Sequence, residues 1–133
     1  MGDSKISHKI LITGVGSYLP TNKFSNESLS NFVDTSDEWI SKRSGIKNRH
    51  FVADNEKTSD MAFFAANKAL ENAQISKNEI DLIVLATTTP DNTFPSTATL
   101  VQKKLEINAV SFDIQAVCAG FVFALSIAKS MMI

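Results

Sequence analysis

Cys118 is the only cysteine of this 133-residue sequence, and its position suggests a chemical role. Before it, residues 110–114 alternate β-branched or aromatic side chains with polar ones, which predicts a strand. From Ala119 onward, Ala, Leu, Phe and Met recur at helical spacing, which predicts a helix. Cys118 is therefore expected where a strand turns into a helix. The unpaired N–H groups and the positive dipole end of that helix would stabilise a negative charge on sulfur and favour a nucleophile.

The neighbours of Cys118 are small. Ala116, Ala119 and Gly120 leave room for a ligand to approach the sulfur and the backbone N–H groups, one of which could stabilise an oxyanion. The alternative is an inert side chain, because free cysteine is usually a small buried hydrophobe. The position of Cys118 leaves both interpretations open.

A second candidate site lies on a predicted helix that begins at Thr35 and ends at Gly45. The spacing of Thr35 and Glu38 fits a capping box. Trp39 and Arg43 are four residues apart and therefore share a face of this helix. An indole and a guanidinium so placed can hold a flat aromatic ring between them. The alternative is a tryptophan packed in the core beneath an arginine that reaches solvent.

The remaining periodicity predicts an α/β fold. A strand is expected over residues 9–15, a short helix with Asn26 as its N-cap, a polar loop around Arg49-His50-Phe51, a long helix over 59–72, a buried parallel strand over 82–86 and a helix capped by Ser96. Residues 1–8 are expected to form a flexible tail. Phe94 stands alone in a loop rich in threonine and proline, where it would suit an interface or a ligand wall if exposed and would anchor the loop if buried.

Composition excludes several classes of function. A formal charge of −1 without a basic run argues against nucleic acid or an anionic membrane surface as a partner. A single cysteine can form neither an internal disulfide nor a cysteine zinc site, so we expect no metal and a reducing, cytoplasmic location. No stretch approaches the roughly 20 apolar residues of a membrane span. A dinucleotide-binding loop at Gly14-Val15-Gly16 is not expected, because position 19 is leucine and Pro20 follows.

Four groups of residues, in order, make the chain from about Lys9 onward similar to the amino-terminal part of β-ketoacyl-acyl-carrier-protein synthase III. They are Gly14-Val15-Gly16-Ser17-Tyr18-Leu19-Pro20, Asp34-Thr35-Ser36-Asp37-Glu38-Trp39-Ile40 with Arg43, Gly45-Ile46 and Arg49-His50, Ala86-Thr87-Thr88 with Phe94-Pro95-Ser96, and Cys118-Ala119-Gly120-Phe121. The resemblance implies a thiolase-like layered fold, αβαβα in the full family, of which residues 9–133 would form a partial amino-terminal domain.

The resemblance also implies roles for individual residues. Cys118 would take an acyl group from a short acyl-CoA as a thioester and pass it to malonyl-acyl-carrier protein, with acyl-CoA as a substrate and no separate cofactor. Trp39 and Arg43, with Thr35 close by, would hold the adenine of CoA. Phe94 would reach across a homodimer to the acyl pocket of the partner. His50 matches a family arginine-histidine pair and not the catalytic histidine, so a structural role is expected for it.

The family completes its active site with a histidine and an asparagine from the second half of its fold, and neither is present among these residues. The resemblance therefore implies that this sequence is a fragment that can be acylated but cannot complete a condensation alone. Two alternatives stay open: an inactive remnant or dimerisation module of the same fold, and another acyl-CoA-using synthase of the thiolase fold.

Overall fold

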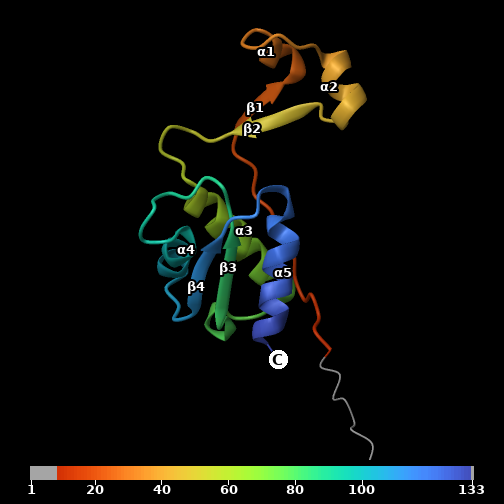
Figure 1. The fold of residues 1–133 in the computed structure, drawn as a ribbon. Coiled ribbons are helices and arrows are strands. Elements are labelled where there is room, and N and C mark those ends of the chain that lie inside the picture. The colour runs from red at the N-terminus through yellow and green to blue at the C-terminus, as the bar shows by residue number, and fades with distance from the viewer. Residues whose placement is uncertain (1–8, 133) are drawn as a thin grey trace, which may run out of the picture. The chain divides into compact units, whose positions relative to one another are not determined.

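The computed structural model describes residues 9–132, which divide into two compact units. One unit contains residues 9–17 and 58–132, and the other contains residues 18–57. The tail expected over residues 1–8 lies outside the described part. In chain order the elements are β1 (Asn22–Ser25), α1 (Asn26–Ser30), α2 (Asp37–Ser44), β2 (Asn48–Phe51), α3 (Thr58–Ala73), η1 (Lys77–Glu79), β3 (Leu82–Ala86), α4 (Thr97–Leu105), β4 (Val110–Ile114), η2 (Val117–Ala119) and α5 (Gly120–Met131) (Figure 1).

A pair of parallel strands forms the centre of the larger unit. Leu82 of β3 lies opposite Val110 of β4, and the register continues to Ala86 opposite Ile114. Parallel neighbours need a crossover connection, which α4 supplies here. The strands predicted over residues 82–86 and 110–114, and the α/β pattern that they form with the helices, are therefore confirmed.

Three helices surround these two strands (Figure 1). Helix α4 contacts both strands, α3 contacts α4, and α5 contacts β3. The most deeply buried apolar side chains of the described residues are Ala98, Val101 and Leu105, all on α4. The core of this unit therefore lies between α4 and the strands. Strand β4, which precedes the segment with Cys118, packs against this core.

The segment before the first helices differs from the prediction. Residues 9–15 were expected to form a strand, but the structure assigns no strand there. A Cβ atom added to Gly14 or Gly16 would collide with backbone atoms of α3, including the carbonyl oxygens of Ala69 and Ala65. The two glycines thus permit a close approach to the small-residue face of α3. An apolar run alone cannot show whether a neighbouring strand is available to pair with it.

A small antiparallel hairpin organises the other unit. Asn22 of β1 lies opposite Phe51 of β2, and the rings of Phe24 and Phe51 meet edge to face with centroids 5.0 Å apart. The prediction of a loop around Arg49-His50-Phe51 is therefore wrong, and β1 was not predicted. Each strand has four residues and at least two polar ones, so neither carries a clear alternating pattern.

The caps of α1 and α2 also lie one residue away from the predicted positions. Ser25, not Asn26, caps α1 by accepting a hydrogen bond from the Ser28 backbone N–H at 3.1 Å. Ser36, not Thr35, caps α2 by accepting from the Trp39 N–H at 3.1 Å. In both cases the serine has the extended backbone that an N-cap requires. Gly45 ends α2 with a φ of 72°, as predicted.

Candidate active site

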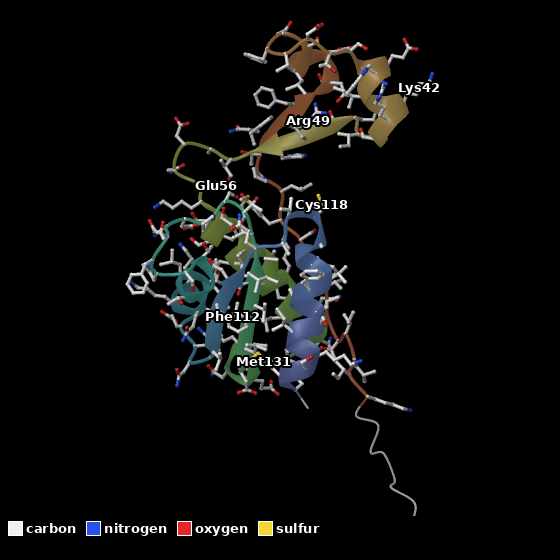
Figure 2. The ribbon with its side chains drawn as sticks, viewed as in Figure 1. Lys42, Arg49, Glu56, Phe112, Cys118 and Met131 are labelled. Atoms are coloured by element: carbon white, nitrogen blue, oxygen red, sulfur yellow. The ribbon has the colours of Figure 1, made fainter. Side chains whose placement is uncertain are left out.

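Cys118 lies in η2, the short turn that joins β4 to α5, at the end of α5 opposite to Met131 (Figure 2). The turn is closed by a hydrogen bond of 3.0 Å from the Ala119 N–H to the Ala116 carbonyl. The cysteine is exposed. The predicted strand-to-helix position is therefore confirmed, and the cysteine is not buried.

The backbone next to the cysteine is strained. Val117 has a φ of 46°, in the left-handed region that β-branched residues rarely adopt. Its side chain is 73% exposed, so burial of the valine does not offset this strain. Such a conformation costs on the order of 1–3 kcal/mol and is typical of functional sites. The sharp turn at Val117 directs the chain from the end of β4 through η2, which carries Cys118, into α5.

The beginning of α5 has no side-chain cap, although the Gly120 N–H donates to the Val117 carbonyl. Its N-cap, Ala119, has no side chain that can accept a hydrogen bond from the first turn. Backbone N–H groups at such a helix start have no partner within the helix, and the helix dipole adds positive potential there. Gly120 is buried, and a Cβ atom at this position would lie 3.0 Å from the Cβ of Ala86. The glycine therefore lets α5 begin close to the end of β3.

An open pocket of about 360 Å³ adjoins Cys118. Its lining combines the turn around the cysteine with the residues that follow β3: Ala86, Thr87, Thr88, Thr89, Ala116, Val117, Cys118 and Gly120. The Thr87 N–H donates to the Ile114 carbonyl at 3.1 Å, which continues the strand pairing to the edge of the pocket. A small acyl thioester therefore has access to the sulfur and to backbone and hydroxyl groups beside it.

The loop after this threonine run is held by polar contacts. The Asp91 carboxylate accepts from the Ser59 N–H at 2.9 Å and from the Ser59 hydroxyl at 2.6 Å. The Asp91 N–H donates to Thr97 Oγ1 at 3.0 Å. Phe94 projects from this loop and is 89% exposed. The structure therefore excludes a buried anchor, and the exposed ring suits an interface or a ligand wall.

Trp39 and Arg43 share a face of α2, as predicted. The Trp39 side chain is exposed, at 55% of its full area, so it is not packed in a core. The guanidinium carbon of Arg43 lies 4.4 Å from the centroid of the indole ring, in a cation–π contact. The two side chains therefore touch each other, and a ligand ring cannot enter between them unless Arg43 moves. Thr35 precedes the helix cap, and its Oγ1 is buried without a hydrogen-bond partner in the described residues.

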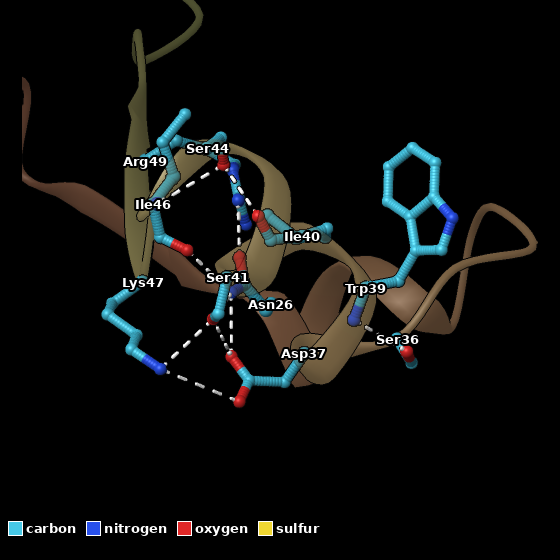
Figure 3. Close-up of polar contacts among 10 residues, drawn as sticks. All are labelled: Asn26, Ser36, Asp37, Trp39, Ile40, Ser41, Ser44, Ile46, Lys47 and Arg49. Carbon is cyan, nitrogen blue, oxygen red and sulfur yellow. Dashed lines mark hydrogen bonds and ion pairs between the residues drawn. The ribbon is translucent and has the colours of Figure 1, made fainter.

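Sequence reasoning missed the polar cluster on the opposite face of α2 (Figure 3). There the side-chain amide of Asn26 donates to Asp37 Oδ1 at 2.7 Å, and the Ser41 hydroxyl donates to the same oxygen at 3.0 Å. These hydrogen bonds, first from Asn26 and then from Ser41, lower the pKa of Asp37 below its ordinary value of 3.8. The only sequence signal was the i, i+4 spacing of Asp37 and Ser41.

His50 makes a contact with the backbone, and the described residues contain no cluster of metal-binding side chains. The His50 ring contacts the Pro20 carbonyl through Nδ1, which is a structural role of the kind expected. Among residues 9–132, no three histidine, cysteine, aspartate or glutamate side chains lie close enough together to hold a metal ion. Nor does the same part of the chain contain a helix long and apolar enough to cross a membrane.

Comparison with curated proteins identifies close relatives. The chain is 64% identical over 121 residues to the β-ketoacyl-acyl-carrier-protein synthase III of Ehrlichia canis and 60% identical over 121 residues to that of Neisseria meningitidis. Each match includes 90% of this chain but only 38% of the relative, so the chain spans little more than a third of these enzymes. No family model matches the chain.

Solved structures give the same result for the fold. The 3-oxoacyl-acyl-carrier-protein synthase III of Aquifex aeolicus is 50% identical, with a TM-score of 0.83 over 91% of this chain and 39% of that one. The priming β-ketosynthase of the R1128 polyketide pathway is 39% identical, with a TM-score of 0.82 over 88% of this chain and 35% of the other. The fold is thus α/β of the thiolase-like type, and nine tenths of the chain is similar to a little more than a third of β-ketoacyl-acyl-carrier-protein synthase III.

Proposed function

We propose that this chain forms part of an acyltransferase that begins fatty-acid synthesis by condensing a short acyl-CoA with malonyl-acyl-carrier protein. The observation that carries the proposal is the exposed Cys118 on a strained turn between β4 and α5, beside an open pocket. The synthase III relatives at 64% and 60% identity support this reaction over others. The chain itself would perform the first half of it, the acylation of the cysteine.

In that half-reaction the Cys118 thiolate attacks the carbonyl carbon of the acyl-CoA thioester. The oxyanion that forms accepts hydrogen bonds from backbone N–H groups, including that of Cys118, at the start of α5. As the intermediate collapses, the bond from carbon to the CoA sulfur breaks. The CoA thiolate leaves and takes up the proton that the cysteine had released, so the acyl group remains on Cys118 as a thioester.

We further propose that the nucleotide end of CoA binds α2. Trp39 would stack on the adenine, and Arg43 would supply positive charge for the nearby phosphates, with Thr35 bordering the site. The exposed indole and its contact with Arg43 support this assignment. Because Arg43 lies against one side of the ring, the adenine would stack on the exposed part of the indole or displace the guanidinium.

The partners and location are proposed on similar grounds. The exposure of Phe94 on a loop held by Asp91 fits a contact with a second copy of the chain in a homodimer. We place the protein in the cytoplasm, because its one free cysteine suits a reducing compartment. Acyl-CoA and malonyl-acyl-carrier protein are its proposed small and macromolecular substrates.

A second candidate is a priming synthase outside fatty-acid synthesis, in which the same cysteine would be acylated but the acceptor would differ. The 39% identity to the R1128 priming β-ketosynthase favours this as the alternative. Supplying the acylated protein with malonyl-acyl-carrier proteins from fatty-acid and polyketide systems would separate the two functions.

The proposed acylation is tested by the release of CoA. The natural protein, mixed with acetyl-CoA, should release close to one equivalent of free CoA in a rapid burst. Cys118→Ala should release none, while Ser126→Ala, a change on α5 away from the turn, should leave the burst intact. A burst of equal size from Cys118→Ala would refute the role of this cysteine.

A further inference from the structure

Asn26 is the most deeply enclosed polar residue of the smaller unit, with 1% of its surface exposed. Its side-chain nitrogen lies 2.7 Å from Asp37 Oδ1, 2.7 Å from the Ile46 carbonyl and 3.3 Å from Ser41 Oγ. Its side-chain oxygen accepts a hydrogen bond from Arg49 Nη2. The residue thus connects the beginning of α2, its second turn, the segment after it and strand β2 (Figure 3).

These partners fix the orientation of the amide. A carboxylate and a carbonyl oxygen can only accept, so they require the NH₂ group of Asn26, whereas the Arg49 guanidinium can only donate and requires the oxygen. Neither aspartate, which has a similar volume, nor leucine, which has a similar branched shape, can supply both functions. Removing the amide would break the hydrogen bonds that this buried side chain makes to Asp37, to the Ile46 carbonyl and to Arg49, and these are the contacts that join α2 to β2.

Helix α2 depends on these contacts because it has no apolar anchor. None of its residues is buried, so packing of an apolar stripe does not fix its rotation. Asp37 and Ser41, four residues apart, both face Asn26. Trp39 follows Asp37 by two residues, and Arg43 follows Ser41 by two residues. Two residues correspond to a rotation of about 200° around a helix. The amide therefore holds one face of α2, while the aromatic and basic pair lies on the other; in Figure 3 the indole projects away from the cluster.

We infer that Asn26 is the positioning residue of the nucleotide-binding helix: it fixes the rotation of α2 and so presents Trp39 and Arg43 to the adenine nucleotide of acyl-CoA. This inference rests on the proposed function. Asn26 itself touches no substrate in this account. It would act through Trp39, and its loss should affect substrates that carry the nucleotide more than substrates that lack it.

The test compares two acyl donors on the natural protein. Acetyl-CoA and S-acetyl-pantetheine deliver the same acyl group to Cys118, but only acetyl-CoA has the adenine nucleotide. The ratio of their second-order acylation rates therefore measures the contribution of nucleotide binding. We expect Trp39→Ala to lower this ratio about tenfold or more, as for loss of a base–aromatic stack. Asn26→Ala should lower it by a similar factor, since a small misplacement of binding groups has large effects.

Two further variants separate positioning from general damage. Phe51→Leu disturbs the edge-to-face ring pair of the same unit and should leave the ratio of rates unchanged. The double variant Trp39→Ala with Asn26→Ala should show little loss beyond that of Trp39→Ala, because both changes remove one function. A multiplicative loss in the double variant, or an equal fall with both donors in Asn26→Ala, would overturn the inference.

An exchange of partners decides the question if Asn26→Ala does not fold. Asn26→Asp places two carboxylates side by side and should lower the ratio of acylation rates. Adding Asp37→Asn restores a donor and an acceptor between these two positions, so the double variant should recover part of the lost ratio. No recovery would overturn the role of Asn26. If Trp39→Ala leaves the ratio unchanged, the proposed nucleotide site fails instead, whatever the Asn26 variants do.

Discussion

At the scale of single residues, Cys118 and Asp37 illustrate two uses of polar groups near helix starts. Cys118 is exposed at the uncapped beginning of α5, where it can react with a ligand. Asp37, in the first turn of α2, is instead committed to internal hydrogen bonds from Asn26 and Ser41. At Cys118 the thiol is accessible to a ligand, whereas at Asp37 the carboxylate accepts hydrogen bonds that stabilise the fold.

The lowered pKa of Asp37 predicts a dependence of stability on acid. Because the folded pKa lies below the ordinary value of 3.8, the carboxylate contributes its full stability above that value. The contribution falls as the pH drops through the folded pKa and is absent below it. Urea unfolding followed from about pH 5 to about pH 2, around the usual aspartate pKa, should show a steeper loss of stability for the wild type than for Asp37→Asn. Parallel curves for the two proteins would contradict this account.

At the scale of elements, the sequence predicted the helices and strands that carry clear periodicity. Strands β3 and β4, helices α3 and α4, and the turn into α5 lie where their apolar patterns placed them. The strand expected over residues 9–15 is wrong, because pairing depends on a neighbour that the pattern does not reveal. The hairpin β1–β2 was missed since its strands are short and polar.

The site was predicted unevenly for the same reason. Cys118 and the shared face of Trp39 and Arg43 follow from local spacing, which a sequence shows directly. The Asn26 cluster joins residues up to 23 positions apart, and the Thr87–Thr89 side of the pocket comes from a different strand than the cysteine. Such contacts depend on tertiary structure and leave no local pattern.

Asp113 gives a prediction at this scale. This β4 residue accepts hydrogen bonds from the backbone N–H groups of Thr97 and Ala98 at 2.7 Å each, and it thereby joins the sheet to the start of α4. Both donors are fully buried, so Asp113→Ala would leave them without partners. We expect a loss of about 2–4 kcal/mol in the free energy of unfolding. Asp91→Asn, which keeps one acceptor for Ser59, should lose less free energy of unfolding in the same urea titration. A loss below about 1 kcal/mol for Asp113→Ala, as for a surface substitution, would contradict the role of this contact.

At the scale of the whole molecule, the described residues bury a small core and expose much apolar surface. Phe121, Val122 and Phe123 on α5 are each more than half exposed. The synthase III relatives are much longer, and the chain spans 38% of their length. An apolar face of this kind favours association with other protein surfaces.

Because the 133 residues span 38% of the synthase III relatives, we expect a protein limited to them to perform only the acylation step. Such a chain should accept an acetyl group on Cys118 but form no ketoacyl product with malonyl-acyl-carrier protein, because the histidine and asparagine that the resemblance implies for decarboxylation are not among these residues. Product analysis by mass spectrometry checks this, with a full-length synthase III as the positive control. Detection of ketoacyl product from the pure 133-residue chain would show that the decarboxylating groups are present after all.

The central claim is that Cys118 carries the acyl group, and the intact mass of the natural protein tests it most directly. After incubation with acetyl-CoA, the protein should gain one acetyl group, and fragmentation should locate it on Cys118; Cys118→Ala should gain none. An unmodified protein would contradict the synthase account and favour an inactive remnant of the fold. An acetyl group on another residue would exclude Cys118 as the nucleophile.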